Sequence, residues 1–301
     1  MKIVVSGSSG LIGSALIDSL RPDGHSISRL VRSGSTATAD VMSKMIRWEP
    51  PTGSIDLAAM EGADAVVNLA GASVAGGRWT TERKQILRRS RVEATRHLVA
   101  SLARLKTKPR VFVSASAVGY YGNRGDEVLT ETSSPGDDFL AHLCRDWEAE
   151  AAKAEHEGIR TVMLRFGIVL AAHGGALQQM LRPFRLGVGG RLGNGRQWMS
   201  WITLEDVVAI IRYSITTDSP RGPVNVVGPN ALTNAEFTSV LAAVLHRPAL
   251  FPAPRLALKV ALGEMADALL ASQRVMPERL AELGYTFHHP QLKEAFASIL
   301  D

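Results

Sequence analysis

The N-terminal stretch of the chain joins an apolar strand to a helix through a turn that contains three glycines. Residues 2–6 read Lys-Ile-Val-Val-Ser, the turn has the spacing Gly7-x-x-Gly10-x-x-Gly13, and an apolar helix is expected to about residue 20. In a dinucleotide site the first glycine allows the sharp turn, the second lets the backbone approach the pyrophosphate, and the third lets helix and strand pack closely. The first N–H groups of the helix then point at the anion. A tight turn without a ligand is the plainer alternative. The residues expected to contact the dinucleotide here are Gly7, Ser9, Gly10, Leu11, Ile12 and Gly13.

The end of the second expected strand, residues 25–32, indicates which dinucleotide is held. A site specific for NAD usually carries an Asp or Glu there, which binds the ribose 2′-hydroxyl. This chain has Arg32 and Ser33 instead. An arginine fork and a hydroxyl suit a 2′-phosphate better than a neutral diol. The sequence therefore predicts that NADP(H) is preferred over NAD(H), unless Arg32 is only a solvated charge at the end of the strand.

Composition places the chain among ordinary globular proteins. It has 301 residues, of which 46% are hydrophobic, and a formal net charge of +5 that is spread along the sequence. Without a basic stripe, no nucleic-acid partner is expected. One cysteine, Cys144, excludes an intramolecular disulfide and a multi-cysteine metal site, and no metal is expected. Neither a signal peptide nor a membrane-length apolar run is found, so a cytoplasmic protein without membrane contact is expected.

Apolar strands alternate with helical patterns through the first two-thirds of the chain. This order predicts an α/β fold, a Rossmann-type doubly wound parallel sheet over residues 1–229, with a substrate-side loop region at about 171–202. Residues 230–301 are expected to form a smaller, mainly helical C-terminal domain on the substrate side. Ligands bind at the carboxyl ends of strands in such sheets, so the small and polar residues there should meet in one cleft. Beyond those already named, the cofactor contacts expected at strand ends are Asn68, Leu69, Ala70, Gly71 and Arg165.

Several longer motifs resemble the extended short-chain dehydrogenase/reductase superfamily. Besides the glycine turn, they are Asn68-Leu-Ala-Gly71, Val113-Ser-Ala-Ser116 and Arg165-Phe-Gly-Ile-Val-Leu170. More narrowly, the chain resembles an atypical family of NAD(P)-dependent nucleoside-diphosphate-sugar-epimerase-like proteins with a short C-terminal helical domain. The motifs that carry this narrower likeness are Gly77-Arg-Trp79, Cys144-Arg-Asp-Trp-Glu148, Gly190-Arg-Leu-Gly-Asn-Gly195, Trp201-Ile-Thr-Leu-Glu-Asp206 and Gln273-Arg-Val-Met-Pro277. The resemblance implies an NADP(H) site more firmly than it implies a reaction, and it allows a homodimer.

The catalytic pattern of that superfamily is incomplete in this chain. The resemblance implies a Ser that binds the substrate oxygen, here Ser116, and a Tyr-x-x-x-Lys on the next helix for proton transfer. When Glu148 is aligned with the Glu that follows that motif, Leu140 stands at the Tyr position and Cys144 at the Lys position. Leucine carries no proton, and a neutral thiol lacks the field of an ammonium group.

Three interpretations of this gap follow. Tyr120 or Tyr121, on the loop after Ser116, could replace the missing phenol. His142 or Cys144 could move the proton by another route. Alternatively, the protein could bind NADP(H) without turnover, as a sensor or regulatory protein.

Arginines and tryptophans outside these motifs could form the substrate side. Such side chains suit a nucleotide-sugar, although a lid packed on its own domain would contain the same residues. The sequence thus predicts an NADP(H)-binding oxidoreductase or epimerase-like enzyme acting on a small carbonyl or nucleotide-sugar-like substrate. The residues considered for the substrate wall are Arg78, Trp79, Arg191, Asn194, Arg196, Trp198 and Trp201.

Overall fold

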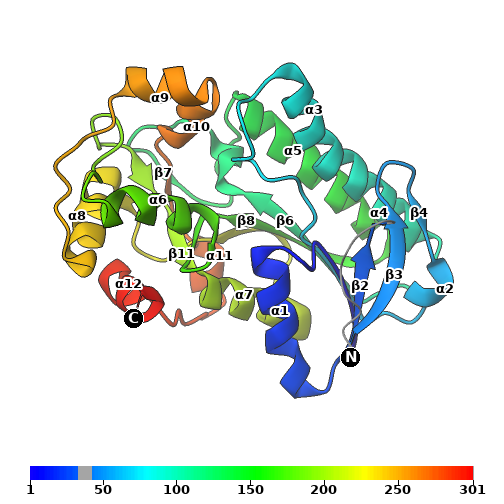
Figure 1. Cartoon of the computed structure of the whole chain (residues 1–301). Helices are drawn as coiled ribbons and strands as arrows, with labels where there is room; N and C mark the ends of the chain where they lie inside the picture. Colours follow the sequence, from blue (N-terminus) through cyan, green and yellow to red (C-terminus); the bar gives the residue numbers. More distant parts are fainter. Residues whose placement is uncertain (33–42, 301) are drawn as a thin grey trace.

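An eight-stranded sheet forms the centre of the molecule (Figure 1). In the computed structural model, which describes residues 1–32 and 43–300, the strand order is β12-β8-β6-β5-β1-β2-β3-β4. All neighbouring strands are parallel except β3 and β4. The predicted Rossmann-type parallel sheet is therefore confirmed. The strands are β1 (Lys2–Ser6), β2 (Ser26–Val31), β3 (Ser43–Glu49), β4 (Ser54–Ile55), β5 (Ala65–Asn68), β6 (Val111–Ala117), β8 (Arg160–Phe166) and β12 (Gly222–Val226).

Helices cover both faces of this sheet because its central strands are buried on both sides. Figure 1 shows the sheet between α1 and α7 on one side and α3, α4 and α5 on the other. Val67 and Val113 pack toward the first pair of helices, whereas Val66 and Phe112 pack toward α4 and α5. The helices are α1 (Leu11–Leu20), α3 (Thr81–Arg88), α4 (Ala94–Ala103), α5 (Phe139–Ala152) and α7 (Leu204–Thr216).

Three elements differ from the sequence prediction. The apolar spacing over residues 82–105 predicts one continuous helix, whereas in the structure a π-helical turn, η2 (Arg89–Glu93), separates α3 from α4. The strand β3 was not predicted. The region 171–202, expected to be a loop, contains the helix α6 (Gly175–Arg185), whose buried Leu177, Leu181 and Phe184 follow helical spacing. The glycine-rich stretch after this helix is irregular, as predicted.

A second lobe has its own apolar core. Phe237 of α8 and Phe296 of α12 meet edge to face at 5.2 Å between ring centroids, and Trp201 is buried beside them. The pattern Thr233-x-x-Glu236 predicts a capping box, and this capping box is present at the start of α8. The elements of this lobe are β9 (Ile168–Ala171), α6, β10 (Trp198–Met199), β11 (Trp201–Thr203), β13 (Leu232–Thr233), α8 (Asn234–Leu245), α9 (Arg255–Leu262), α10 (Met265–Leu269) and α12 (Leu292–Leu300).

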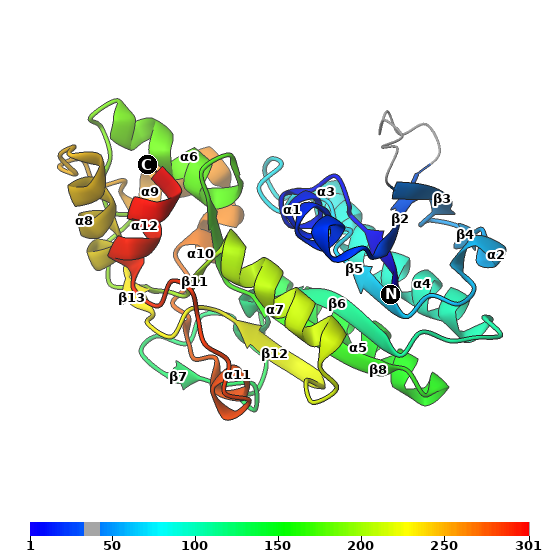
Figure 2. The ribbon, with the colours of Figure 1, turned by 90° about the horizontal axis from the view of Figure 1, so that it is seen from below.

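The C-terminal segment does not stay within this lobe. The strand β14 (Arg274–Val275) pairs with β7 (Val128–Leu129), and the helix α11 (Glu278–Glu282) packs beside β12 (Figure 2). The Asn225 Nδ2 atom of β12 donates to the Met276 carbonyl at 2.9 Å. Residues well beyond position 230 therefore complete the Rossmann side of the molecule. The predicted domain boundary at 229 and the possible homodimer stay predictions.

Among the described residues, none of the helices combines the length and the apolar character that a bilayer crossing requires.

One buried carboxylate ties the start of α7 to the segment that leads into α12. Asp206 is 1% exposed, and its oxygens accept from the backbone N–H groups of His288 at 2.8 Å and His289 at 3.2 Å. It also accepts from the Thr203 hydroxyl at 2.9 Å, and Thr203 caps α7 as the sequence predicts. This carboxylate therefore fixes the start of α7 against the segment at residues 288–289.

Replacing Asp206 by Ala should lower the free energy of unfolding by about 2–4 kcal/mol, because buried donors lose a charged acceptor. Glu205→Ala is the matched control, since this neighbouring carboxylate is exposed and, among the described residues, pairs with His289 alone. Its effect should stay within about 0.5 kcal/mol. Urea unfolding followed by circular dichroism measures both values, and equal effects would contradict the assignment.

Candidate functional site

The glycine turn has the geometry of a phosphate cradle. Gly7 has φ +66°, and a Cβ there would lie 2.5 Å from the Leu69 carbonyl oxygen. A Cβ on Gly13 would lie 2.3 Å from the Gly7 oxygen, so this position has no room for a side chain. Gly10 is different: it is exposed, and a Cβ there would contact only the Gly7 oxygen, at 3.3 Å. Gly7 and Gly13 are therefore needed for close packing, whereas Gly10 leaves the surface of the cradle accessible.

A cavity of about 480 Å³ opens at this turn, at the carboxyl ends of β1, β2 and β5. Its location matches the site at which ligands bind in open α/β sheets. Many of the residues predicted to contact a cofactor line it. They are Gly7, Ser9, Gly10, Arg32, Leu69, Ala70 and Gly71.

Other predicted contacts do not line this cavity. Leu11 would meet a Cβ on Gly174 at 3.0 Å, so its side chain packs toward the second lobe, while Ile12 packs on the main core. Both residues stand in the first turn of α1, where backbone N–H groups lack helical partners. Asn68 is 1% exposed and bonds internally to Ser6 at 2.7 Å and Thr95 at 2.9 Å, so its side chain is structural. Ser33 lies outside the described residues.

Three arginines are among the described residues that line this cavity. Arg32 is exposed at the end of β2, and Arg89 reaches the same cavity from the π-helical turn. Arg29 also lines it, with its Nε donating to the Ser8 hydroxyl at 3.1 Å. Among the described residues that line the cavity, Glu93 is the one carboxylate. Neither Arg29 nor Arg89 is predicted from the sequence, because strict alternation along β2 places Arg29 and Arg32 on opposite faces of a flat strand.

Trp48 was missed as well. It stands near the end of β3, is 2% exposed and lines the cavity. Its indole Nε1 is buried without a hydrogen-bond partner among the described residues. Buried donors are normally paired, so this N–H fits an acceptor on a molecule that fills the cavity. Together with the glycine cradle, it shows that the residues present suit a dinucleotide.

The predicted serine lies in a buried polar network. Ser116 donates to the Glu148 carboxylate at 2.6 Å. Arg165 holds the same carboxylate through two bonds of 2.8 Å, from Nε and Nη2. Its Nη1 donates to the Tyr121 hydroxyl at 2.9 Å. The prediction that Arg165 contacts the cofactor is wrong, because its guanidinium is 2% exposed and is bound inside the protein.

Tyr121 is also wrongly predicted as a catalytic phenol. Its ring is completely buried, and its hydroxyl donates to Asn225 Oδ1 at 2.6 Å while accepting from Arg165. Burial raises the pKa of Tyr121 to about 12, so the phenol holds its proton. Tyr120 is half-buried and stacks over the Arg165 guanidinium at 3.5 Å, which leaves it the more accessible of the two.

Neither Leu140 nor Cys144 offers a replacement for the missing pair. Leu140 lines a cavity of about 350 Å³ together with Trp79 and Phe139. Cys144 is buried, and burial raises the pKa of its thiol to about 12, with the nearby Glu148 carboxylate adding to the rise. His142 is exposed on α5 and contacts Asp137 at 2.8 Å.

Only some of the residues predicted to form the substrate wall line a cavity in the structure. Asn194 and Arg196 line a cavity of about 560 Å³, which shares Arg255 and Leu270 with the cavity beside Leu140. Trp201, by contrast, is buried in the second lobe and donates to the Asn230 carbonyl at 2.9 Å. Its assignment to the substrate wall is therefore wrong.

Fold and cradle together define a nucleotide-binding protein of the Rossmann class. The chain belongs to the NAD-dependent epimerase/dehydratase family, whose model matches residues 3–228. A domain of unknown function, DUF1731, matches residues 253–299. The resemblance inferred from the sequence motifs is thereby confirmed.

Relatives of similar length occur in bacteria and plants. An epimerase family protein of Mycobacterium tuberculosis is 44% identical over 294 residues, which cover 97% of this chain and 95% of the relative. A chloroplastic homologue of the epimerase family protein SDR39U1 from Arabidopsis thaliana is 38% identical over 311 residues, which cover 100% and 87%.

Two solved structures are similar in both sequence and fold. The human epimerase family protein SDR39U1, solved with NADPH, has a TM-score of 0.88 and 32% identity over 99% of each chain. A nucleoside-diphosphate sugar epimerase from Corynebacterium glutamicum has a TM-score of 0.81 and 34% identity, covering 100% of this chain and 58% of its own.

Replacing Gly10 by Ala should weaken NADPH binding at least about tenfold without unfolding the protein, because the added methyl group occupies the open surface of the cradle. Gly13→Ala should instead destabilise the protein, since its methyl group would overlap the Gly7 backbone. NADPH fluorescence titration and thermal unfolding separate the two effects. Unchanged NADPH affinity in Gly10→Ala would contradict the assignment of the cradle.

Proposed function

We propose that this protein is an NADP(H)-dependent oxidoreductase or epimerase-like enzyme that acts on a small carbonyl or nucleotide-sugar-like substrate. The observation that carries this proposal is the cavity at the glycine cradle, where the described lining residues include three arginines and one carboxylate. A 2′-phosphate is a dianion that arginine forks bind well. The similar human protein, solved with NADPH, supports the same choice of cofactor.

Different residues of the chain would bind different parts of the cofactor. The Gly7–Gly10 turn and the first turn of α1 would hold the pyrophosphate. Arg32, with Arg29 and Arg89, would hold the 2′-phosphate, and the unpaired indole N–H of Trp48 would donate to an acceptor on the adenosine end. When bound, the nicotinamide supplies or accepts a hydride.

Ser116 would orient the substrate through the lone pairs of its oxygen. Its proton is committed to Glu148, so its oxygen can accept a hydrogen bond from a hydroxyl of a sugar-like substrate or from the alcohol form of a small carbonyl substrate. The substrate would lie toward Leu140 and Trp79, in the cavity that continues past Arg255. Tyr120, stacked on Arg165, is the phenol left to take part in proton transfer.

A second function is favoured by one specific observation, the absence of an activated phenol at position 140. Leu140 stands where the superfamily pattern has Tyr, and the neighbouring Tyr121 is sealed by Arg165 and Asn225. These residues suit a protein that binds NADP(H) as a sensor or regulator without turnover.

Turnover of NADPH with a panel of aldehydes, ketones and nucleotide sugars distinguishes the two functions. In the enzyme, Ser116→Ala should lower kcat by about 10–100-fold with little change in NADPH affinity, as expected for a substrate-orienting group. Tyr120→Phe should also lower kcat. Tyr121→Phe is the control, because its buried hydroxyl serves the fold. Tight NADPH binding with no turnover of any compound would favour the sensor instead.

Arg32→Asp should weaken NADPH binding by about 1–3 kcal/mol and leave NADH binding nearly unchanged, because only the 2′-phosphate loses a partner. Arg185→Asp, the same charge change on the exposed face of α6, controls for net charge. Isothermal titration with both cofactors measures the difference. Equal affinity of the parent protein for NADH and NADPH would contradict the role of Arg32.

A further inference from the structure

The residues of the π-helical turn η2 face the loop that follows β5. Arg89 and Ser90 line the cofactor cavity, and the next side chain, Arg91, reaches the same loop, since its Nη2 donates to the Ala72 carbonyl at 3.0 Å. The Ala72 N–H in turn donates to the Ser90 hydroxyl at 3.1 Å. Consecutive residues of a regular α-helix point about 100° apart, whereas these two bond the same residue. Such turns are rare and are frequently found at functional sites.

The Arg91 guanidinium lies directly beside a glycine of that cavity. Gly71 is exposed and lines the cavity, and a Cβ on it would lie 3.1 Å from Arg91 Cζ and 3.2 Å from Nη2. The Cζ atom also lies 5.4 Å from the centroid of the Trp147 ring, which is a cation–π distance. The guanidinium is therefore held in place by α5 and by the backbone that forms the cavity wall.

Arg91 carries a charge that no carboxylate balances. It is partly buried, and it forms no ion pair in the part of the chain that the structure describes. Besides the bond to Ala72, its Nη1 approaches the Ser90 hydroxyl at 3.4 Å and the Leu87 carbonyl at 3.5 Å, both near the long limit of a hydrogen bond. A guanidinium has five N–H donors, and buried charges are normally paired. Arg91 therefore keeps donors for the oxygen atoms of a ligand.

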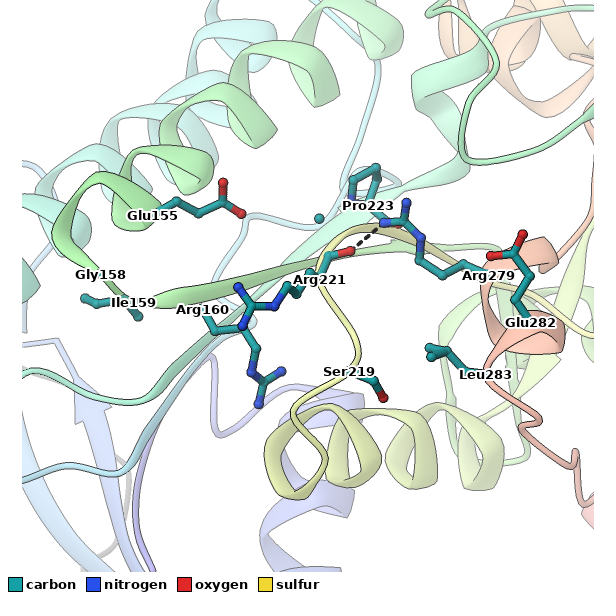
Figure 3. Close-up of a pocket in the computed structure, with 11 residues that line it drawn as sticks. Glu155, Gly158, Ile159, Arg160, Ser219, Arg221, Pro223, Arg279, Glu282 and Leu283 are labelled. Atoms are coloured by element: carbon teal, nitrogen blue, oxygen red, sulfur yellow. Dashed lines mark hydrogen bonds between the residues drawn. The ribbon is translucent and has the colours of Figure 1, made fainter.

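Other arginine-lined surfaces of the molecule differ in this respect. A cavity of about 760 Å³ lies at the amino ends of β8 and β12. Figure 3 shows that arginines and carboxylates share it, namely Arg160, Arg221, Arg279, Glu155 and Glu282. The three guanidinium groups there point in different directions and do not meet at one site.

The sheet order indicates which part of the cofactor Arg91 would meet. The neighbouring strands β2, β1, β5 and β6 lead from Arg32, assigned above to the 2′-phosphate, to Ser116, assigned to the substrate. The nicotinamide must approach Ser116 if a hydride is to reach the substrate. The Cys144 thiol lies within hydrogen-bond reach of Ser116, and the Arg91 guanidinium lies within electrostatic reach of the same thiol. Arg91 is therefore on the nicotinamide side of the cavity.

We propose that Arg91 binds the nicotinamide half of NADP(H), an inference that rests on the proposed function. Its remaining N–H groups would donate to oxygen atoms of the nicotinamide ribose. Because Ala72 and Trp147 already order the guanidinium, little conformational entropy is lost when it binds. Arg91 thus supplies, from η2, a cation that the superfamily pattern places at position 144.

Calorimetric titration of the full chain with NADPH and with adenosine 2′,5′-bisphosphate tests the proposal. The bisphosphate carries the adenosine and the 2′-phosphate but lacks the nicotinamide ribose. Arg91→Gln should weaken NADPH binding at least about tenfold and change bisphosphate binding by less than about twofold. Glutamine keeps an N–H donor for the Ala72 carbonyl, so the loop should stay in place. Arg91→Lys should restore part of the NADPH affinity, because it restores the positive charge.

Arg83→Gln is the matched control, because Arg83 also bonds this loop, at the Ser73 carbonyl, but lies beside Gly76 rather than Gly71. This variant should bind both ligands as the parent protein does. Equal losses for both ligands in Arg91→Gln would show that the loop has moved, and unchanged NADPH affinity would show that Arg91 makes no contact. Either result overturns the proposal. A parent protein that binds neither ligand would overturn the proposed function, and this inference with it.

Discussion

The ion pair between Glu148 and Arg165 holds the centre of the molecule together. Both side chains are at most 10% exposed, and the two bonds between them are 2.8 Å long. Burying two charges is costly, and the cost is offset only when the remaining polar atoms are also bonded. Here Ser116 donates to Glu148, and Arg165 also donates to Tyr121 and to the Glu131 carbonyl. The pair therefore joins α5, β6 and β8 in one polar network.

This network continues into the C-terminal segment. Tyr121 donates to Asn225 of β12, whose backbone N–H donates to Glu131 Oε1 at 2.9 Å. The same oxygen accepts from the Arg279 backbone N–H at 3.3 Å. Burial raises the pKa of Glu131, whose second carboxylate oxygen has no partner among the described residues. The C-terminal segment is thus bonded to the centre of the Rossmann side.

The sequence predicts those features that depend on local pattern. The glycine spacing at Gly7, Gly10 and Gly13 depends directly on backbone geometry, and the predicted turn agrees with the structure. The helix starts indicated by Thr203 and Thr233 also agree, because an N-cap is a local feature. The functions of Tyr121 and Arg165 depend instead on partners that are distant in sequence, such as Asn225 at 104 positions from Tyr121. The sequence near Ser116 does not show whether the Tyr121 hydroxyl faces an open cleft or, as in the structure, the buried side-chain amide of Asn225. Trp48 was missed for the same reason, because only the folded sheet places it in the cavity.

Position 144 illustrates how the surroundings limit the chemistry. The Arg91 guanidinium lies within the electrostatic reach of Cys144 and donates to the Ala72 carbonyl at 3.0 Å. Burial lowers the pKa of Arg91, which reflects the cost of holding even one cation there. A lysine at position 144 would add a second buried cation, and the nearby Glu148 carboxylate is already bonded to Arg165. A neutral thiol avoids that repulsion, so Cys144 is compatible with Arg91 where the superfamily's lysine is not.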